Sequence, residues 1–112
     1  MFKLFGIPNC DTVKKARTCL EKKKIDFEFI DFKKVKPLAQ DIERWKEAFG
    51  DYPVNTKGVT YKKHKDEYEA LPPKARIKFL QENTSMIKRP ILEKNGKVLS
   101  FGFDEEKYRE VK

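Results

Sequence analysis

One stretch decides the fold of this chain: Lys3-Leu4-Phe5-Gly6-Ile7-Pro8-Asn9-Cys10-Asp11-Thr12-Val13-Lys14-Lys15-Ala16. A short apolar run ends at Gly6, and Pro8-Asn9 interrupts the extended pattern. Apolar residues then recur at helical spacing at Val13, Ala16 and Leu20. We therefore predict a strand over Phe2 to Phe5, a tight turn, and a helix from Asp11 to about Lys24.

Cys10 lies at the start of this predicted helix or just before it, because Asn9 and Asp11 are both good N-cap residues. Unpaired backbone N–H groups and the positive end of the helix dipole face its sulfur, and Lys14 lies one turn further along the same face. These effects favour the thiolate, which is the reactive form, so Cys10 is the candidate nucleophile. The alternative is a small buried apolar residue, and this stretch alone gives the two interpretations equal weight.

The length and composition predict a single domain over residues 1–112. The chain is 38% hydrophobic, with nine Phe, and can build a core, while 39% of its residues are charged. The net charge of +8 raises the question of nucleic acid. The lysines are spread along the chain and mixed with acids, as in Glu21-Lys22-Lys23-Lys24, so we expect a solvated basic face and no nucleic-acid partner.

The two cysteines, Cys10 and Cys19, are nine residues apart on one predicted helix. Their Cα atoms would be roughly 13 Å apart, about twice the reach of a disulfide. We therefore interpret Cys19 as a packing residue rather than a resolving thiol. No stretch resembles a signal segment or reaches membrane-spanning length, so we expect a reducing cytoplasm and no membrane partner. We also expect a monomer.

The next segment, Ile25 to Phe32, alternates as a strand does, with Phe27 and Phe29 on one face. A strand joined to the first one through a helix should pair with it in parallel, as a βαβ unit.

A helical insertion is expected over about residues 37–84. Pro37 is predicted to open a helix in which Leu38, Ile42, Trp45 and Phe49 recur at helical spacing, and Gly50 suits its C-terminal end. The pattern is then lost, and we predict a basic loop from Asp51 to His64, one helical turn over Glu67 to Leu71, and a helix from Pro73 to about Asn83. His64 is the only histidine, so no metal site is expected.

The C-terminal part predicts a hairpin followed by a helix. Ile91 to Glu93 and Lys97 to Phe101 flank Asn95-Gly96, the strongest short hairpin signal, which indicates antiparallel strands joined by a type I′ turn. Asp104 is expected to cap a last helix. The predicted order is βαβ, a helical insertion, then ββα, which is an α/β fold around a mixed sheet.

This order, with a Cys at the start of the first helix, resembles the thioredoxin fold. Two motifs narrow the resemblance: Gly6-Ile7-Pro8-Asn9-Cys10-Asp11-Thr12-Val13-Lys14-Lys15-Ala16 and Ile87-Lys88-Arg89-Pro90-Ile91-Leu92, with Asn55-Thr56-Lys57-Gly58 between them. They resemble the ArsC-like arsenate reductase family over about residues 2 to 110. Within that family they look most like the YffB-type proteins, described as probable glutathione-dependent thiol reductases.

The resemblance implies roles for individual residues. Cys10 matches the family's nucleophile, Arg89 an arginine that holds the oxyanion or glutathione beside the thiolate, and Pro90 a cis-proline. A second family arginine falls on Lys57, which keeps the charge but loses the bidentate fork. Asn9 and Lys14 complete the predicted substrate- or glutathione-binding set.

Two departures qualify these roles. The third arginine of true arsenate reductases falls on Phe103, which weakens arsenate as the substrate. Regulators of the Spx type usually carry a second Cys where this chain has Val13, so an internal dithiol switch is not expected.

The resemblance therefore implies an oxidoreductase in which the Cys10 thiolate forms a covalent adduct with a small oxyanion or a disulfide. Since no internal thiol is in reach, the adduct would be resolved by glutathione or another low-molecular-weight thiol, with no bound cofactor. The alternative is an Spx-like regulator that binds RNA polymerase and has no turnover.

Overall fold

The computed structural model describes residues 1–111 and has an α/β fold with a four-stranded mixed sheet. The chain divides into two compact units. The first unit combines Met1–Val35 with the segment from Arg89 onward, and the second spans Lys36–Lys88. In residues 1–111 no helix is long and apolar enough to cross a membrane.

The sheet belongs to the first unit and has the strand order β2-β1-β3-β4. The strands are β1 (Phe2–Gly6), β2 (Phe27–Asp31), β3 (Ile91–Lys94) and β4 (Lys97–Phe101). β1 pairs in parallel with β2 and antiparallel with β3, and β3 pairs antiparallel with β4. The predicted parallel pair and the hairpin are both confirmed. The hairpin turn places Asn95 at φ 52° and Gly96 at φ 82°, the left-handed conformation that a type I′ turn requires.

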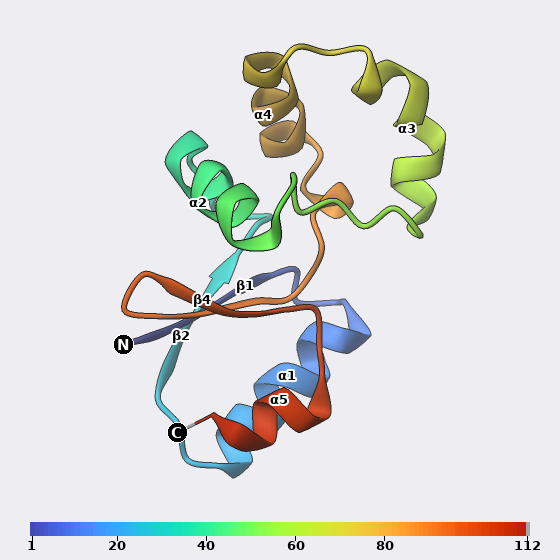
Figure 1. Cartoon of the computed structure of the whole chain (residues 1–112). Helices are drawn as coiled ribbons and strands as arrows, with labels where there is room; N and C mark the ends of the chain where they lie inside the picture. Colours follow the sequence, from blue (N-terminus) through green and yellow to red (C-terminus); the bar gives the residue numbers. More distant parts are fainter. Residues whose placement is uncertain (112) are drawn as a thin grey trace. The chain divides into compact units, whose positions relative to one another are not determined.

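Helices α1 (Asp11–Lys22) and α5 (Glu105–Glu110) lie next to each other in the first unit (Figure 1). They supply one side of a core whose other side comes from β1 and β3; its buried members are Phe2, Leu4, Ala16, Leu20, Leu92 and Tyr108. α1 ends two residues before the predicted Lys24, because Lys24 adopts a positive φ of 59° and turns the chain toward β2.

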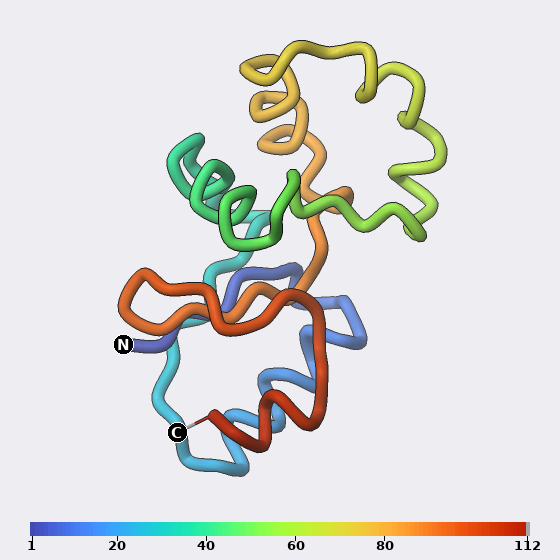
Figure 2. The backbone as a smooth tube through the Cα atoms, in the orientation of Figure 1, coloured from blue at the N-terminus to red at the C-terminus, as the bar shows by residue number. Residues whose placement is uncertain are grey.

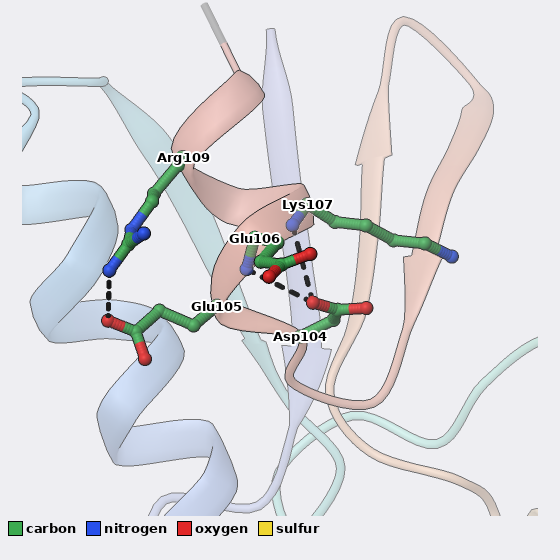
Figure 3. A network of polar contacts seen from close by, with 5 residues as sticks. All are labelled: Asp104, Glu105, Glu106, Lys107 and Arg109. Carbon is green, nitrogen blue, oxygen red and sulfur yellow. Dashed lines mark hydrogen bonds and ion pairs between the residues drawn. The ribbon is translucent and has the colours of Figure 1, made fainter.

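The cap of α5 is the one that the sequence predicts. The Asp104 carboxylate accepts hydrogen bonds from the backbone N–H groups of Glu106, at 3.0 Å, and Lys107, at 3.4 Å (Figure 3). One turn further on, the Arg109 guanidinium donates to the Glu105 carboxylate at 3.0 Å. These contacts stabilise a helix of only six residues.

The second unit contains α2 (Ala39–Phe49), α3 (Val59–Glu69), α4 (Pro73–Glu82) and the short 3₁₀ helix η1 (Thr84–Met86), and Figure 2 follows the chain through them. α2 begins two residues after the predicted Pro37 and ends at Gly50, which has φ 92°. Trp45 and Ile42 are fully buried, as their spacing predicts. Leu38 and Phe49, from the same apolar series, are 57% and 40% exposed because they lie at the helix ends.

The predicted basic loop from Asp51 to His64 is wrong in its second half, because α3 begins at Val59 and includes His64. The turn predicted over Glu67 to Leu71 is the end of this same helix. Val59 is 83% exposed, and the buried face of α3 consists of Tyr61 and Tyr68, two turns apart. Because polar or charged residues occupy most other positions of α3, this buried face is too narrow to give a clear apolar period.

Two extended segments of the second unit pair with each other through their backbones. Val54 and Ile87 form an antiparallel bridge. The Asn55 N–H donates to the Met86 carbonyl, and the Lys88 N–H donates to the Pro53 carbonyl, both at 2.8 Å. The segment that leads out of the second unit is thus paired through its backbone with the segment between α2 and α3.

Candidate active site around Cys10

The turn before α1 places Cys10 at the N-cap of the helix. The Cys10 N–H donates to the Ile7 carbonyl at 3.2 Å, and the Lys14 N–H donates to the Cys10 carbonyl at 2.9 Å. Gly6 makes this close approach feasible, because a Cβ built there would lie 2.7 Å from Val13 Cγ2. The end of β1 and the first turn of α1 are therefore in direct contact, and the position of the thiol follows from that contact.

The Cys10 sulfur is partly exposed and lies 3.2 Å from the Thr12 hydroxyl. That hydroxyl also donates to the Arg89 carbonyl at 3.4 Å. Since a hydroxyl has one proton, Thr12 can give it either to the sulfur or to the carbonyl. Thr12 thus links the thiol to the segment that precedes β3.

The pKa of the Cys10 thiol is lowered in this site. Burial has the largest single influence and raises the pKa, since it disfavours the charged form. The Thr12 hydroxyl, the Val13 backbone amide and the Arg89 guanidinium act in the opposite direction and together outweigh it. The thiolate is therefore populated at a lower pH than in an ordinary cysteine.

Arg89 lies beside the thiol, close enough to attract it electrostatically and to donate a hydrogen bond to it. The next peptide bond, Arg89-Pro90, is cis. Pro90 is buried, and its carbonyl accepts the Gly102 N–H at 2.8 Å. The structure thus brings together the two motifs that lie far apart in the sequence.

Three further residues are predicted for the site, namely Asn9, Lys14 and Lys57. Asn9 is exposed in the turn before Cys10. The Lys14 side chain lines a surface hollow with Thr18 and Cys19, and the lowering of the Cys10 pKa has the other causes given above. Lys57 is exposed and belongs to the second unit, in the turn from Asn55 to Gly58.

Both positions that depart from the family pattern, Phe103 and Val13, hold apolar side chains that pack against neighbouring residues. Phe103 packs against Tyr108 with ring centroids 5.0 Å apart, so that position is part of the core. Val13 is fully buried against Gly6. Cys19 is free, as is Cys10, and packs against the core beside α5, which fits its interpretation as a packing residue.

Thr12 is the residue that the sequence analysis missed. Its signal is a hydroxyl two positions after a cysteine at a helix start, where short side chains commonly bond to nearby backbone and polar groups. The described residues contain no cluster of three or more His, Cys, Asp or Glu side chains that could hold a metal ion.

The mixed sheet, the thiol at the start of the first helix and the cis-proline before β3 define a thioredoxin-like α/β protein. The model of the ArsC family matches residues 5–111. This chain therefore belongs to the ArsC family.

Solved structures and curated relatives agree with this assignment. A YffB protein is 33% identical, with a TM-score of 0.82 and coverage of 97% of this chain and 96% of that one. An arsenate reductase (ArsC) related protein from Brucella melitensis is 34% identical, with a TM-score of 0.71 over 96% of this chain and 91% of that one. The global transcriptional regulator Spx of Listeria innocua is 28% identical over 97% of this chain and 85% of its own length.

Proposed function

We propose that this protein is a monothiol reductase that uses Cys10 as its nucleophile and a small external thiol, such as glutathione, as its reductant. The observation that carries the proposal is the environment of the sulfur at the N-cap of α1, where Thr12, the Val13 amide and Arg89 lower its pKa. The likeness to an arsenate reductase related protein supports the same reaction class.

With a disulfide substrate, the Cys10 thiolate attacks one sulfur, the substrate S–S bond breaks, and the other sulfur leaves as a thiolate that takes up a proton. An external thiolate then attacks the mixed disulfide and releases Cys10, and a second external thiol completes the external disulfide. The two electrons come from the two external thiols. An oxyanion substrate would instead accept the thiolate and lose water, and Arg89 would balance its charge.

The proposed setting is a reducing cytoplasm, because that compartment supplies the external thiol. The second candidate function is a regulator of the Spx type, which the Listeria innocua relative favours. In a regulator, Cys10 would be a sensor or an unused thiol, and the protein would not turn over.

The first experiment measures the alkylation of Cys10 by iodoacetamide as a function of pH, with mass spectrometry to locate the label. Because the pKa of Cys10 is lowered, its rate should rise and level off at a lower pH than for a free cysteine, whose pKa is roughly 8.5. At pH values below that lowered pKa the thiol is protonated, and the alkylation rate should be low. The unfolded chain gives the reference curve.

The second experiment incubates the protein with oxidised glutathione. The proposal expects one adduct, on Cys10, that excess reduced glutathione removes. An adduct on Cys19 alone, or an alkylation curve equal to that of the unfolded chain, contradicts the proposal. Rapid alkylation without catalytic turnover of any disulfide or oxyanion would favour the regulator.

A further inference from the structure

We propose that a hollow in the second unit binds a small organic monocarboxylate with a flat apolar body. The hollow has a volume of about 320 Å³, at the lower end of the range of small-molecule sites. This inference goes beyond the proposed function and does not depend on Cys10, which belongs to the other unit.

Aromatic rings line part of this hollow, among mostly polar and charged neighbours; the rings are Phe49, Tyr52, Tyr61 and Tyr68. Tyr61 and Tyr68 meet edge to face with ring centroids 6.4 Å apart. Rings in this arrangement offer both faces and edges to a flat apolar group. These rings can pack against a planar part of a ligand, while the polar remainder of the wall is available to its charged end.

The charges around the hollow leave an excess of one positive charge. Lys57, Arg76 and Lys88 line it, against Asp51 and Glu69. Protein donors already engage both carboxylates: the Tyr52 N–H donates to Asp51 at 2.7 Å, and the Tyr61 hydroxyl donates to Glu69 at 3.0 Å. A monoanion would balance the remaining charge.

The Tyr68 hydroxyl is a hydrogen-bond donor for which such an anion would supply the acceptor. The Tyr68 residue is only 5% exposed, and within residues 1–111 its hydroxyl has no hydrogen-bond partner. Burial, the largest cause, raises its pKa to about 12, while Arg76 lowers it and Asp51 raises it. The hydroxyl thus keeps its proton at neutral pH, and a buried donor without an acceptor costs free energy.

Arg76 is only partly available to an anion in the hollow. Its Nε donates to the Leu71 carbonyl at 2.9 Å, and its Nη2 donates to the Glu69 carbonyl at 2.7 Å. The guanidinium also lies over the Tyr68 ring, 5.2 Å from the centroid. The Nε–Nη2 edge of the guanidinium is thus occupied, whereas its Nη1 end remains for an anion. The Tyr68 hydroxyl and the lysine ammonium groups remain as well, and with an excess of one positive charge they suit a monocarboxylate better than a phosphate dianion.

The test is a titration of the full chain with 4-fluorobenzoate, followed by ¹⁹F NMR of the ligand and amide NMR of the protein. We expect saturable binding with shifts in Asp51–Lys57 and along α3, and weaker binding as salt is added. The neutral analogue 4-fluorobenzamide should bind at least about tenfold more weakly, since it lacks the charge. Inorganic phosphate should not compete at equal concentration.

Two variants test the residues. Tyr68→Phe removes only the hydroxyl and should weaken 4-fluorobenzoate binding about tenfold, because a hydrogen bond to a charged group is lost. The matched control is Tyr108→Phe, which removes a buried hydroxyl in the other unit that also has no partner within residues 1–111. Lys57→Met, at an exposed position where folding is not at stake, should weaken binding about threefold.

The result expected from the Cys10→Ser chain is unchanged binding, so failure of the proposed function and failure of this site are distinguishable. The proposal is overturned by the absence of saturable binding, by equal affinity for the amide, by shifts confined to residues outside the second unit, or by effective competition from phosphate. An equal loss of 4-fluorobenzoate affinity in Tyr68→Phe and Tyr108→Phe also overturns the proposal.

Discussion

The two compact units differ in how they hold polar groups in place. At the thiol, the groups that favour charge are a backbone amide, a short hydroxyl side chain and an arginine next to a buried proline, all fixed by the ends of β1, α1 and β3. In the second unit, the hollow takes its charges from long side chains on helices and loops. The first arrangement suits bond making, which needs precise placement. The second arrangement suits binding, in which several weak contacts together supply the binding free energy.

The largest expected effect concerns the sulfur itself. Cys10→Ser should reduce the turnover of a small disulfide in the presence of glutathione by at least about a hundredfold, because no other thiolate replaces the nucleophile. Cys19→Ser is the matched control, and its turnover should stay within about twofold of that of the unchanged chain. An equal loss of turnover in both variants, or full turnover without Cys10, would remove the proposed contrast between a reactive first unit and a binding second unit.

The next effect concerns the contact that positions the thiol. Gly6→Ala places a Cβ against Val13, and the β-branched side chain has little room to yield. We expect a loss of about 1 to 3 kcal/mol in the free energy of unfolding, as for other overpacked sites, together with slower alkylation of Cys10.

Gly50→Ala is not a suitable control for Gly6, because Gly50 has a positive φ of 92°. Ala48→Gly, on the exposed end of α2, gives a baseline of about 1 kcal/mol for helix propensity alone. Chemical denaturation measures both changes. A Gly6→Ala chain with unchanged stability and unchanged thiol reactivity would show that the helix start tolerates displacement.

The smallest effect concerns one hydroxyl. Thr12→Val removes a contact that lowers the pKa of Cys10, so the pKa should rise and the thiolate fraction at pH 7 should fall. We expect a decrease of about threefold in the alkylation rate at pH 7, and no decrease well above pH 9, where the thiol is ionised in either chain.

Thr18→Val is the control for Thr12, because Thr18 lies on the same helix but lines the hollow beside Cys19. Its alkylation curve for Cys10 should coincide with that of the unchanged chain. An equal decrease in both variants would mean that the loss comes from the helix and not from the contact with sulfur.

The same contrast explains how far the sequence could predict the structure. In the first unit, the turn at Pro8-Asn9, the Asn95-Gly96 hairpin and the Asp104 cap are local signals, and local signals decide those elements. The proximity of Arg89 to Cys10 required the family resemblance, since nothing in either segment alone specifies it. The contact of Thr12 with the Cys10 sulfur has a local signal, but its hydrogen bond to the Arg89 carbonyl depends on where the chain returns more than seventy residues later.

In the second unit, Trp45 could be placed in a core from its spacing. α3 could not be predicted, because its buried face is two tyrosines among polar and charged residues and its stability comes from tertiary packing rather than from its own pattern. The hollow could not be predicted either, since its walls come from four separate segments of the insertion. Local chemistry is visible in a sequence, whereas cavities are products of packing.

Val13, buried against Gly6, has a consequence for the timing of the proposed chemistry. A second sulfur at that position could attack an adduct on Cys10 from within the chain, at a rate independent of the surroundings. With valine there, the covalent state persists until a thiol arrives by diffusion. The lifetime of modified Cys10 would then depend on the ambient thiol concentration. Where thiols are abundant the adduct is a short-lived catalytic intermediate, and where they are exhausted it becomes a persistent modification.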